Sequence, residues 1–299
     1  LPAGEVRIRQ TAIGVNFHDC YVRSGSYKTL RLPGIPGLEA AGRVEAVGAG
    51  VANFKPGDRV AYFSAAYGGY ASERLIRADL LVRLPEAIDD KTAASVMVKG
   101  LTAHMLLHRV HQVKAGDRIL VHAASGGVGV LLCQWAAKIG AEVIGTVGSM
   151  AKAELARKNG CAHTILYRDE DFVARVRDIT GGKGVAVAYD SVGRDTFMGS
   201  LECLGMLGHL VNFGQSSGPV EPLAIARLSA RSNSVTRPML FHYTADAAKR
   251  DAMAGELFAA IGGGTLKVDA PRLFPLGEAA AAHRALEARE TTGAVVLTS

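Results

Sequence analysis

The stretch VHAASGGVGVLLCQWAAKIGA constrains the fold of this chain more than any other part of the sequence. An apolar run meets three glycines, Gly126, Gly127 and Gly129, which open a long apolar helical pattern. Glycines at a helix N-terminus let phosphate groups approach the backbone amides, where the helix dipole is positive. Ala123 replaces the usual first glycine, so the pattern is A-x-x-G-x-x-G. Together with the strand that follows the helix, this pattern predicts a unit that binds a dinucleotide.

The segments around this loop predict two domains. From residue 98 to 238, short Val- and Ile-rich runs alternate with longer helical patterns, which predicts an α/β domain with a doubly wound parallel sheet. Residues 1–97 carry short alternating runs separated by turns, which predicts a mainly β domain. Residues 239–299 contain two helical patterns, ADAAKRDAMAGELFAAIGGG and GEAAAAHRALEAR, before the strand-like AVVLTS. We therefore expect this last part to rejoin the first domain.

Composition and charge exclude several classes of protein. The net charge is +6, but basic and acidic residues interleave, as in YRDEDFVARVRDITGGKG, which favours a solvated surface over a nucleic-acid track. No apolar run reaches the length of about 18 residues that a membrane span needs. The cysteines form no C-x-x-C pair, which argues against a zinc knuckle or a disulfide framework and favours a reducing, cytoplasmic compartment; they are Cys20, Cys133, Cys161 and Cys203. The opening LPAGEVRIRQ is typical of a strand entered partway, so we expect the natural chain to begin further upstream.

The segment EVIGTVGSMAKAE indicates which dinucleotide fits. Its strand ends at Val147, about 20 residues beyond the glycines, where an NAD-binding chain carries an Asp or Glu for the adenosine ribose. This chain has Gly148, Ser149 and Lys152 instead. A hydroxyl donor and a cation suit a 2′-phosphate, which a carboxylate would repel. The loop therefore predicts NADPH, with Tyr167 at the end of the next strand as a further neighbour of that phosphate.

Several motifs in their order along the chain resemble the zinc-independent quinone oxidoreductases of the medium-chain dehydrogenase/reductase superfamily. They are NFHDCYVRSGSY, PGLEAAGRVEAVGAGV, KGLTAHMLL, HAASGGVG, GTVGSMAKAE, YDSVGRDTF, NFGQSSG and VTRPML. The resemblance implies a GroES-like β domain built from residues 1–97 and 239–299 and a Rossmann domain built from residues 98–238. It also implies reduction of a quinone by NADPH, and a homodimer.

The same superfamily contains zinc enzymes, so the metal positions can be compared. Asn16 stands where the zinc branch has a Cys, and Leu38 stands where it has a His. We expect no metal there, because neither side chain is a zinc ligand. His104, His108 and His111 fall on one helical face, but without an acidic or thiol companion they predict a partly exposed helix rather than a metal site.

The resemblance also implies individual roles. Asn16, Tyr21 and Tyr27 match positions around the nicotinamide and the substrate, where an amide can hold a carboxamide or quinone oxygen and phenols can stack or donate. Tyr27 is one candidate proton donor to the reduced oxygen, and solvent is the other. The implied cofactor contacts are Thr102, Ser125, Gly126, Gly127, Val128, Ser191, Val192, Phe213, Gly214, Gln215 and Arg237, with Gly148, Ser149, Lys152 and Tyr167 at the 2′-phosphate.

Two alternatives stay open at this level. Reduction of an enone or enoyl thioester would use the same cofactor loop and differ only where the substrate binds. An RNA-binding role, associated with crystallin-like members of the group, would need a basic track with clustered aromatic residues. Aromatic residues make up only 6% of the chain and do not cluster, which disfavours RNA binding.

Overall fold

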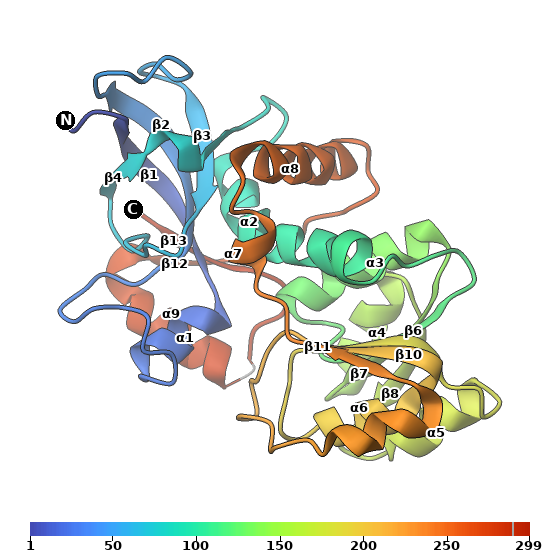
Figure 1. Cartoon of the computed structure of the whole chain (residues 1–299). Helices are drawn as coiled ribbons and strands as arrows, with labels where there is room; N and C mark the ends of the chain where they lie inside the picture. The colour runs from blue at the N-terminus through green and yellow to red at the C-terminus, as the bar shows by residue number, and fades with distance from the viewer. Residues whose placement is uncertain (289) are drawn as a thin grey trace. The chain divides into compact units, whose positions relative to one another are not determined.

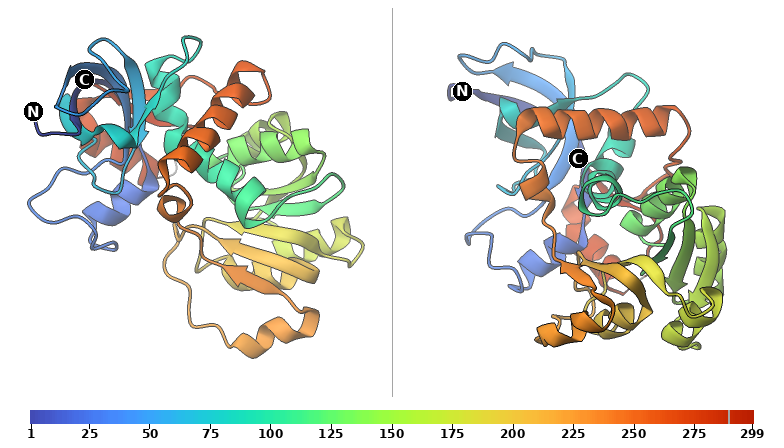
Figure 2. Two further views of the ribbon diagram at one scale, coloured as in Figure 1. Left: turned by 45° about the horizontal axis from the view of Figure 1, so that its top comes forward. Right: turned by 45° about the vertical axis from the view of Figure 1, so that its right-hand side comes forward.

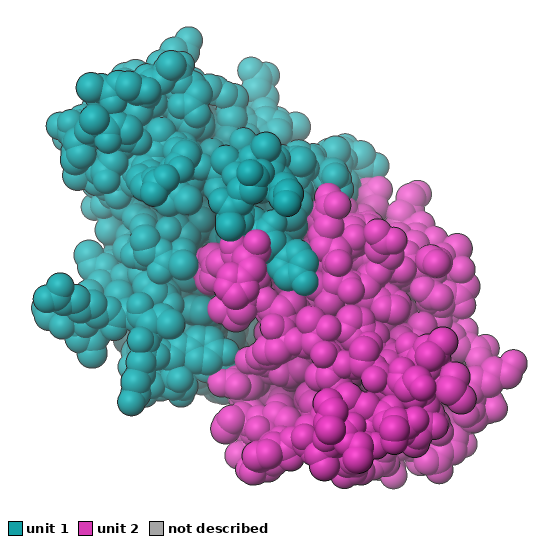
Figure 3. Space-filling model, viewed as in Figure 1, with its two compact units in different colours: residues 1–101, 243–264, 268–299 teal, residues 102–242, 265–267 magenta. Residues whose placement is uncertain are grey.

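The chain forms two compact units in a computed structural model that describes residues 1–288 and 290–299. Unit 1 comprises Leu1–Leu101, Tyr243–Gly264 and Val268–Ser299, and unit 2 comprises Thr102–His242 with Thr265–Lys267 (Figures 1 and 3). Most of residues 239–299 therefore belong with the first hundred residues, whereas residues 239–242 and 265–267 belong to unit 2. The assignment of substrate to unit 1 and cofactor to unit 2 remains a prediction.

Unit 1 is built on one largely antiparallel sheet. Its strands run in the order β12-β13-β1-β2-β3-β5, with β4 paired to β1, and only β12 and β13 are parallel. The strands are β1 (Glu5–Val15), β2 (Glu39–Val47), β3 (Arg59–Phe63), β4 (Glu73–Arg77), β5 (Leu81–Arg83), β12 (Arg272–Pro275) and β13 (Val295–Thr298). The helices are α1 (Phe17–Arg23), the first twelve residues of α2 (Asp90–Met105), α8 (Ala247–Gly262) and α9 (Ala279–Glu287). The short α7 (Leu240–Tyr243) spans the boundary between the units.

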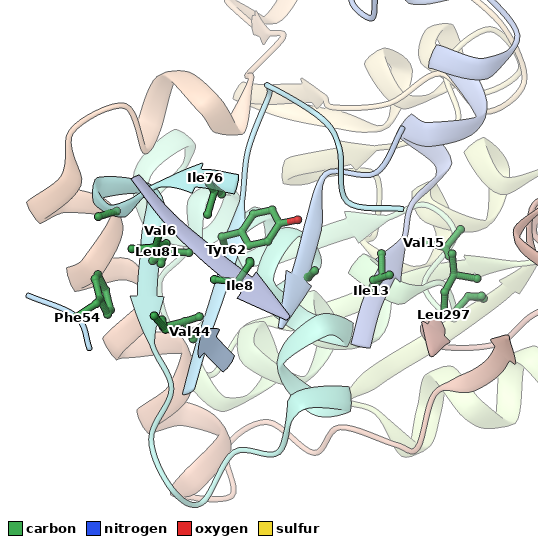
Figure 4. Close-up of a cluster of buried hydrophobic side chains, with 14 of the residues drawn as sticks. Val6, Ile8, Ile13, Val15, Val44, Phe54, Tyr62, Ile76, Leu81 and Leu297 are labelled. Atoms are coloured by element: carbon green, nitrogen blue, oxygen red, sulfur yellow. The ribbon is translucent and has the colours of Figure 1, made fainter. Parts of the chain in front are cut away.

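The strand β1 organises the core of unit 1. Its first half pairs with β2 and β4, and its second half pairs with β2 and β13. Val6 and Ile8 point into an apolar cluster with Val44, Tyr62 and Leu81, which Figure 4 shows. Burying each such side chain stabilises the fold by about 1.5–3 kcal/mol. The alternating pattern read from the sequence thus identifies the core face of this sheet.

Unit 2 is a parallel sheet with helices between its strands. The strand order is β11-β10-β9-β6-β7-β8. The strands are β6 (Arg118–Val121), β7 (Glu142–Val147), β8 (Cys161–Leu166), β9 (Val185–Asp190), β10 (Leu204–Asn212) and β11 (Ser234–Thr236). The helices are α3 (Gly127–Ile139), α4 (Met150–Lys158), α5 (Phe172–Ile179) and α6 (Phe197–Cys203). This arrangement confirms the predicted doubly wound α/β class.

The strand order reverses direction at β6, whose neighbours are β7 and β9. Right-handed crossovers therefore place α3 and α4 on one face of the sheet and α5 and α6 on the other, and Figure 2 shows helices on both faces. The His122 side chain lies on the face covered by α5 and α6. Its Nδ1 is 2.9 Å from Thr146 Oγ1, and its Nε2 is 2.8 Å from Ser200 Oγ on α6. In open α/β sheets, ligands bind at the carboxyl ends of the strands beside such a reversal.

The histidine pattern in unit 2 differs from the prediction. α2 ends at Met105 and continues as one π-helical turn over Leu106–Val110, so His111 lies beyond the helix. His104 is fully buried, whereas His108 and His111 are half-buried, and the ring centroids of His104 and His108 lie 4.8 Å apart. Both rings pack edge-on against Trp135. The expected partly exposed helix face is therefore wrong for His104, which is a core residue.

All four cysteines are buried and free, as small apolar side chains would be. The sequence spacing gave no sign that Cys133 and Cys161 would meet, yet their sulfur atoms lie 3.4 Å apart between α3 and β8. The predicted helix GEAAAAHRALEAR corresponds to α9, and its last residue, Arg289, lies outside the described residues. Within the described part of the chain, no helix is both long and apolar enough to span a membrane.

Candidate cofactor and active site

The glycine loop of unit 2 has the geometry of a phosphate-binding turn. Ala123 adopts a left-handed conformation with φ of 52°, so an alanine supplies the turn that glycine usually makes. Gly126 caps α3, and its amide donates to Ala123 O at 2.8 Å. A Cβ added at Gly129 would lie only 2.3 Å from that same carbonyl oxygen. The loop therefore requires glycine at 129, and the first amides of α3, at Gly127 and Val128, have no partner inside the helix.

The acid-free loop after β7 lies at the carboxyl end of its strand. Ser149 caps α4, and its hydroxyl oxygen accepts from the Lys152 amide at 3.4 Å. The cap is a structural role that the sequence prediction did not include, and it leaves the hydroxyl hydrogen available for an acceptor. Gly148 allows Tyr167 to approach, because a Cβ there would lie 2.8 Å from the phenol oxygen. The structure thus brings Gly148, Ser149, Lys152 and Tyr167 together.

A third group of predicted residues gathers where β9, β10 and β11 end. Arg237 follows β11 and donates to Asn212 Oδ1 and to Gly214 O, the latter at 2.8 Å. Gly214 lies against the β9 loop, since its missing Cβ would be 2.5 Å from Ser191 O. Val192 and Phe213 belong to the same two loops. Thr102, by contrast, lies on α2, and no hydrogen bond in the described residues joins it to this group.

Asp190 holds the β9 loop, and sequence reasoning missed it. The carboxylate is fully buried at the end of β9. Its Oδ1 accepts from the Val192 amide at 2.8 Å, from the Gly193 amide at 3.0 Å and from Thr196 Oγ1 at 2.8 Å. Within the described residues, Oδ2 has no hydrogen-bond partner. Through these three hydrogen bonds, the buried Asp190 carboxylate holds the loop after β9 in one conformation.

In unit 1, Asn16 caps α1 and is almost buried, with 6% of its surface exposed. Its amide nitrogen Nδ2 donates to Glu39 Oε1 at 2.8 Å. Glu39 is fully buried on β2 and also accepts from Lys99 Nζ at 3.2 Å and from the Val98 amide at 2.6 Å. Gly14 makes room for this carboxylate, because a Cβ there would lie 2.3 Å from Oε1. Neither Glu39 nor Lys99 was predicted.

Tyr21 and Tyr27, the two predicted phenols, lie together with ring centroids 4.9 Å apart. His18 packs edge-on against Tyr27 at 5.2 Å, and its Nε2 lies 3.0 Å from the Tyr67 hydroxyl. Tyr67 also bonds Thr29 and has φ of 53°, a left-handed conformation that is strained for a bulky residue. Burial lowers the pKa of His18 to about 4, so the imidazole is neutral at neutral pH.

A chain of hydrogen bonds leads from Asp19 toward α9. Tyr70 OH donates to Asp19 Oδ2 at 3.2 Å and lies 2.8 Å from His283 Nε2, while Arg23 Nη1 lies 3.1 Å from His283 Nδ1. Because a guanidinium only donates, Nδ1 accepts and the His283 proton lies on Nε2. Burial raises the pKa of the Asp19 carboxyl to about 7, and the Glu39 carboxylate acts in the same direction. Asp19 therefore titrates near neutrality.

In unit 1, the two positions that hold zinc ligands in the zinc branch are occupied by Asn16 and Leu38, neither of which is a usual zinc ligand. Asn16 bonds Glu39, and Leu38 is buried. Across the described residues, no group of three or more His, Cys, Asp or Glu side chains is arranged to hold a metal ion. One feature of the sequence could have identified Glu39 and Lys99. Each is a charged residue inside an apolar run, GLEAAG for Glu39 and VMVKGL for Lys99.

Comparisons with known families agree with this fold. Residues 2–86 match the family described as alcohol dehydrogenase GroES-like domain, and residues 127–253 match the family described as zinc-binding dehydrogenase. The two matches and the two sheets define the class as a medium-chain dehydrogenase/reductase.

Individual relatives indicate the family within this class. The chain is 48% identical to a quinone oxidoreductase of Pseudomonas aeruginosa and 46% identical to a 2-haloacrylate reductase of a Burkholderia species, each over 98% of this chain and 90% of the relative. The crystal structure of Escherichia coli quinone oxidoreductase complexed with NADPH superposes with a TM-score of 0.96 at 45% identity, over 100% of this chain and 94% of that one. The chain belongs to the quinone oxidoreductase family.

Proposed function

We propose that this protein is an NADPH-dependent quinone oxidoreductase that transfers a hydride, or electrons singly, to a quinone without a metal. The observation that carries the proposal is the acid-free loop of Gly148, Ser149 and Lys152 beside Tyr167 at the end of β7. The relatives named quinone oxidoreductase support the acceptor class. When bound, NADPH supplies the reducing equivalents.

The residues of unit 2 would hold the cofactor along the carboxyl edge of its sheet. The Gly127 and Val128 amides at the N-terminus of α3, with Ser125 and Gly126 in the turn before them, would face a pyrophosphate, while the Gly126 amide itself donates to Ala123 O. Ser149 and Lys152 would bind the 2′-phosphate with a hydroxyl and a positive charge. The loops that contain Ser191, Val192, Phe213, Gly214 and Arg237 would follow the remaining length, with Thr102 on the nicotinamide side.

Unit 1 would contribute the acceptor site. The paired phenols of Tyr21 and Tyr27 offer flat, polar-edged surfaces on which a planar quinone can stack. After reduction, the quinone oxygen takes a proton from solvent or from the Tyr27 phenol. Because the His18 imidazole is neutral, it would place no positive charge beside the Tyr21 and Tyr27 rings. Asn16 would contact the nicotinamide or the acceptor.

A second candidate function is reduction of an activated carbon–carbon double bond, as in an enone. The relative named 2-haloacrylate reductase favours it, because its identity to this chain nearly equals that of the quinone oxidoreductases. The cofactor site would be the same in both cases, and only the group that receives the hydride would differ.

The test is to follow nicotinamide oxidation by the purified protein with NADPH and NADH against a panel of quinones and enones. Lys152→Gln removes the proposed phosphate contact and should raise the KM for NADPH about tenfold while leaving the KM for NADH unchanged. Lys158→Gln, at the far end of α4, is the matched control and should change neither. Equal use of NADH by the wild-type chain would contradict the 2′-phosphate site, and turnover of enones alone would favour the second candidate.

We further propose that the protein is a cytoplasmic homodimer that binds no nucleic acid. Four buried, free cysteines support a reducing compartment. Support for self-association comes from β11, an edge strand of the unit 2 sheet, and from Met206 and Leu207 on neighbouring β10, which are 72% and 73% exposed. Sedimentation analysis at micromolar concentration tests the proposed dimer, and a monomer would contradict self-association.

A further inference from the structure

A buried cluster of hydrogen-bonding side chains in unit 2 is centred on His122, the residue that directly follows β6. Its Nδ1 lies 2.9 Å from Thr146 Oγ1 on β7, and its Nε2 lies 2.8 Å from Ser200 Oγ on α6. His122, Thr146 and Ser200 each have at most 2% of their surface exposed. Polar groups buried this deeply are costly unless they are paired, so both contacts of the imidazole matter to the fold around them.

The single hydroxyl hydrogen of Ser200 determines the direction of both contacts. Ser200 Oγ donates to the Thr196 carbonyl oxygen at 2.8 Å. The same oxygen must therefore accept from His122, which places the imidazole proton on Nε2. Burial lowers the pKa of His122, although the Asp190 carboxylate favours the charged form, so the ring is neutral at neutral pH. Its unprotonated Nδ1 then accepts from the Thr146 hydroxyl.

The contact with Thr146 connects two of the loops that we propose to hold the cofactor. His122 precedes Ala123, whose left-handed conformation forms the glycine turn before α3. Thr146 lies two residues before Gly148, which begins the acid-free loop after β7. The hydrogen bond between the two side chains therefore fixes the start of one loop against the start of the other.

The contact with Ser200 leads to a third loop, the one after β9. Ser200 Oγ bonds the carbonyl of Thr196, and the Thr196 hydroxyl donates to Asp190 Oδ1 at 2.8 Å. That carboxylate oxygen also accepts from two backbone amides of the loop after β9. A change at Ser200 therefore reaches this loop through a continuous series of hydrogen bonds.

We infer that His122 is a positioning residue that holds three loops of the proposed cofactor site in fixed positions relative to one another, by donating from Nε2 to Ser200 and accepting at Nδ1 from Thr146. This role rests on the proposed function. The Thr146 contact serves the loop that would bind the 2′-phosphate, which NADH lacks. The Ser200 contact serves a loop along the part that NADPH and NADH share. The two contacts therefore have separable effects on cofactor binding.

The test removes the contacts singly with Thr146→Val and Ser200→Ala, and together with His122→Phe. Dissociation constants for NADPH and NADH are measured by fluorescence titration. Thr146→Val should weaken NADPH binding about fivefold and leave NADH binding unchanged. Ser200→Ala should weaken the binding of both cofactors by about the same factor. His163→Phe is the matched control, since this β8 histidine bonds Glu142 instead, and it should change neither constant.

Two further measurements test whether the hydroxyls act through the imidazole. The double variant His122→Phe/Thr146→Val should prefer NADPH over NADH no less than His122→Phe alone. If His122→Phe does not fold, His122→Gln replaces it in the same cycle, because the amide nitrogen of glutamine can keep the contact with Ser200 while the contact with Thr146 is lost. In the wild type, long-range ¹H–¹⁵N NMR should place the His122 proton on Nε2, with or without cofactor.

Three results would overturn the positioning role. One is a His122 proton on Nδ1. Another is an unchanged preference for NADPH over NADH in Thr146→Val, because a merely structural role lowers the melting midpoint without altering that ratio. The third is a further loss of preference in the double variant. A wild-type chain that does not bind NADPH would overturn the proposed function as well, whereas tight wild-type binding with any of the three results would overturn the positioning role alone.

Discussion

At Gly129, in the glycine loop before α3, an added side chain would collide with the backbone. A Cβ there would lie 2.3 Å from Ala123 O and 2.9 Å from the backbone of Ala124, and neither is a flexible side chain. Real Cβ contacts shorter than 3.0 Å essentially do not occur, so Gly129→Ala must separate the loop from α3 by at least about 0.7 Å. Such overpacking costs about 1–3 kcal/mol, partly offset by the better helix propensity of alanine, worth up to about 1 kcal/mol.

We therefore expect Gly129→Ala to lower the midpoint of thermal unfolding by several degrees and to weaken NADPH binding at least tenfold, because the displaced amides no longer match the pyrophosphate. The measurements are differential scanning fluorimetry and fluorescence titration. Gly255→Ala is the control, since it makes the same change inside α8 with nothing within 4 Å of the new Cβ, and it should stabilise the fold slightly. A Gly129→Ala protein with wild-type affinity and melting midpoint would refute the reasoning.

Two further predictions concern buried acids. Asp19 titrates at about 7 in the fold against an ordinary value of 3.8, so its contribution to stability is fully present below pH 3.8 and is lost as pH rises through 7. The loss is at most about 4 kcal/mol, and urea unfolding at pH 5 and pH 8 should show a weaker pH dependence in Asp19→Asn than in the wild type. Asp190→Ala leaves three donors unpaired, which should destabilise the fold by about 2–4 kcal/mol and weaken NADPH binding, whereas Asp190→Asn keeps an acceptor and should lose much less. Equal slopes for Asp19→Asn and wild type, or unchanged unfolding of Asp190→Ala, would contradict these predictions.

Local features could be read from the sequence because their causes lie within a few residues. The A-x-x-G-x-x-G loop, the helix end at Gly140 with φ of 99° and the absence of an acid after Val147 are all short-range properties. The alternation in β1 likewise reports which face is buried. Short-range reasoning missed a second local role at Ser149, whose hydroxyl oxygen also caps α4.

The histidine pattern shows a second kind of failure. Helical spacing put His104 and His111 on one face, but the π-helical turn after Met105 moves His111 off the helix. Burial of His104 depends on Trp135 from α3, which the spacing does not encode. The same holds for Cys133 and Cys161, which are brought together only when β8 pairs with β7 and α3 packs on that sheet.

The sequence by itself determined the parallel and antiparallel halves of this protein, the glycine turn before α3 and the acid-free loop after β7, because each depends on hydrophobic period, backbone freedom or the charge of adjacent residues. Only the tertiary structure decided how Asn16 is oriented. Asn16, Glu39 and Lys99 come from three elements far apart in the chain, and strand pairing of β1 with β2 and packing of α2 bring them within hydrogen-bond distance. The direction of a buried hydrogen bond follows from which donor meets which acceptor, and that depends on the folded arrangement of distant residues.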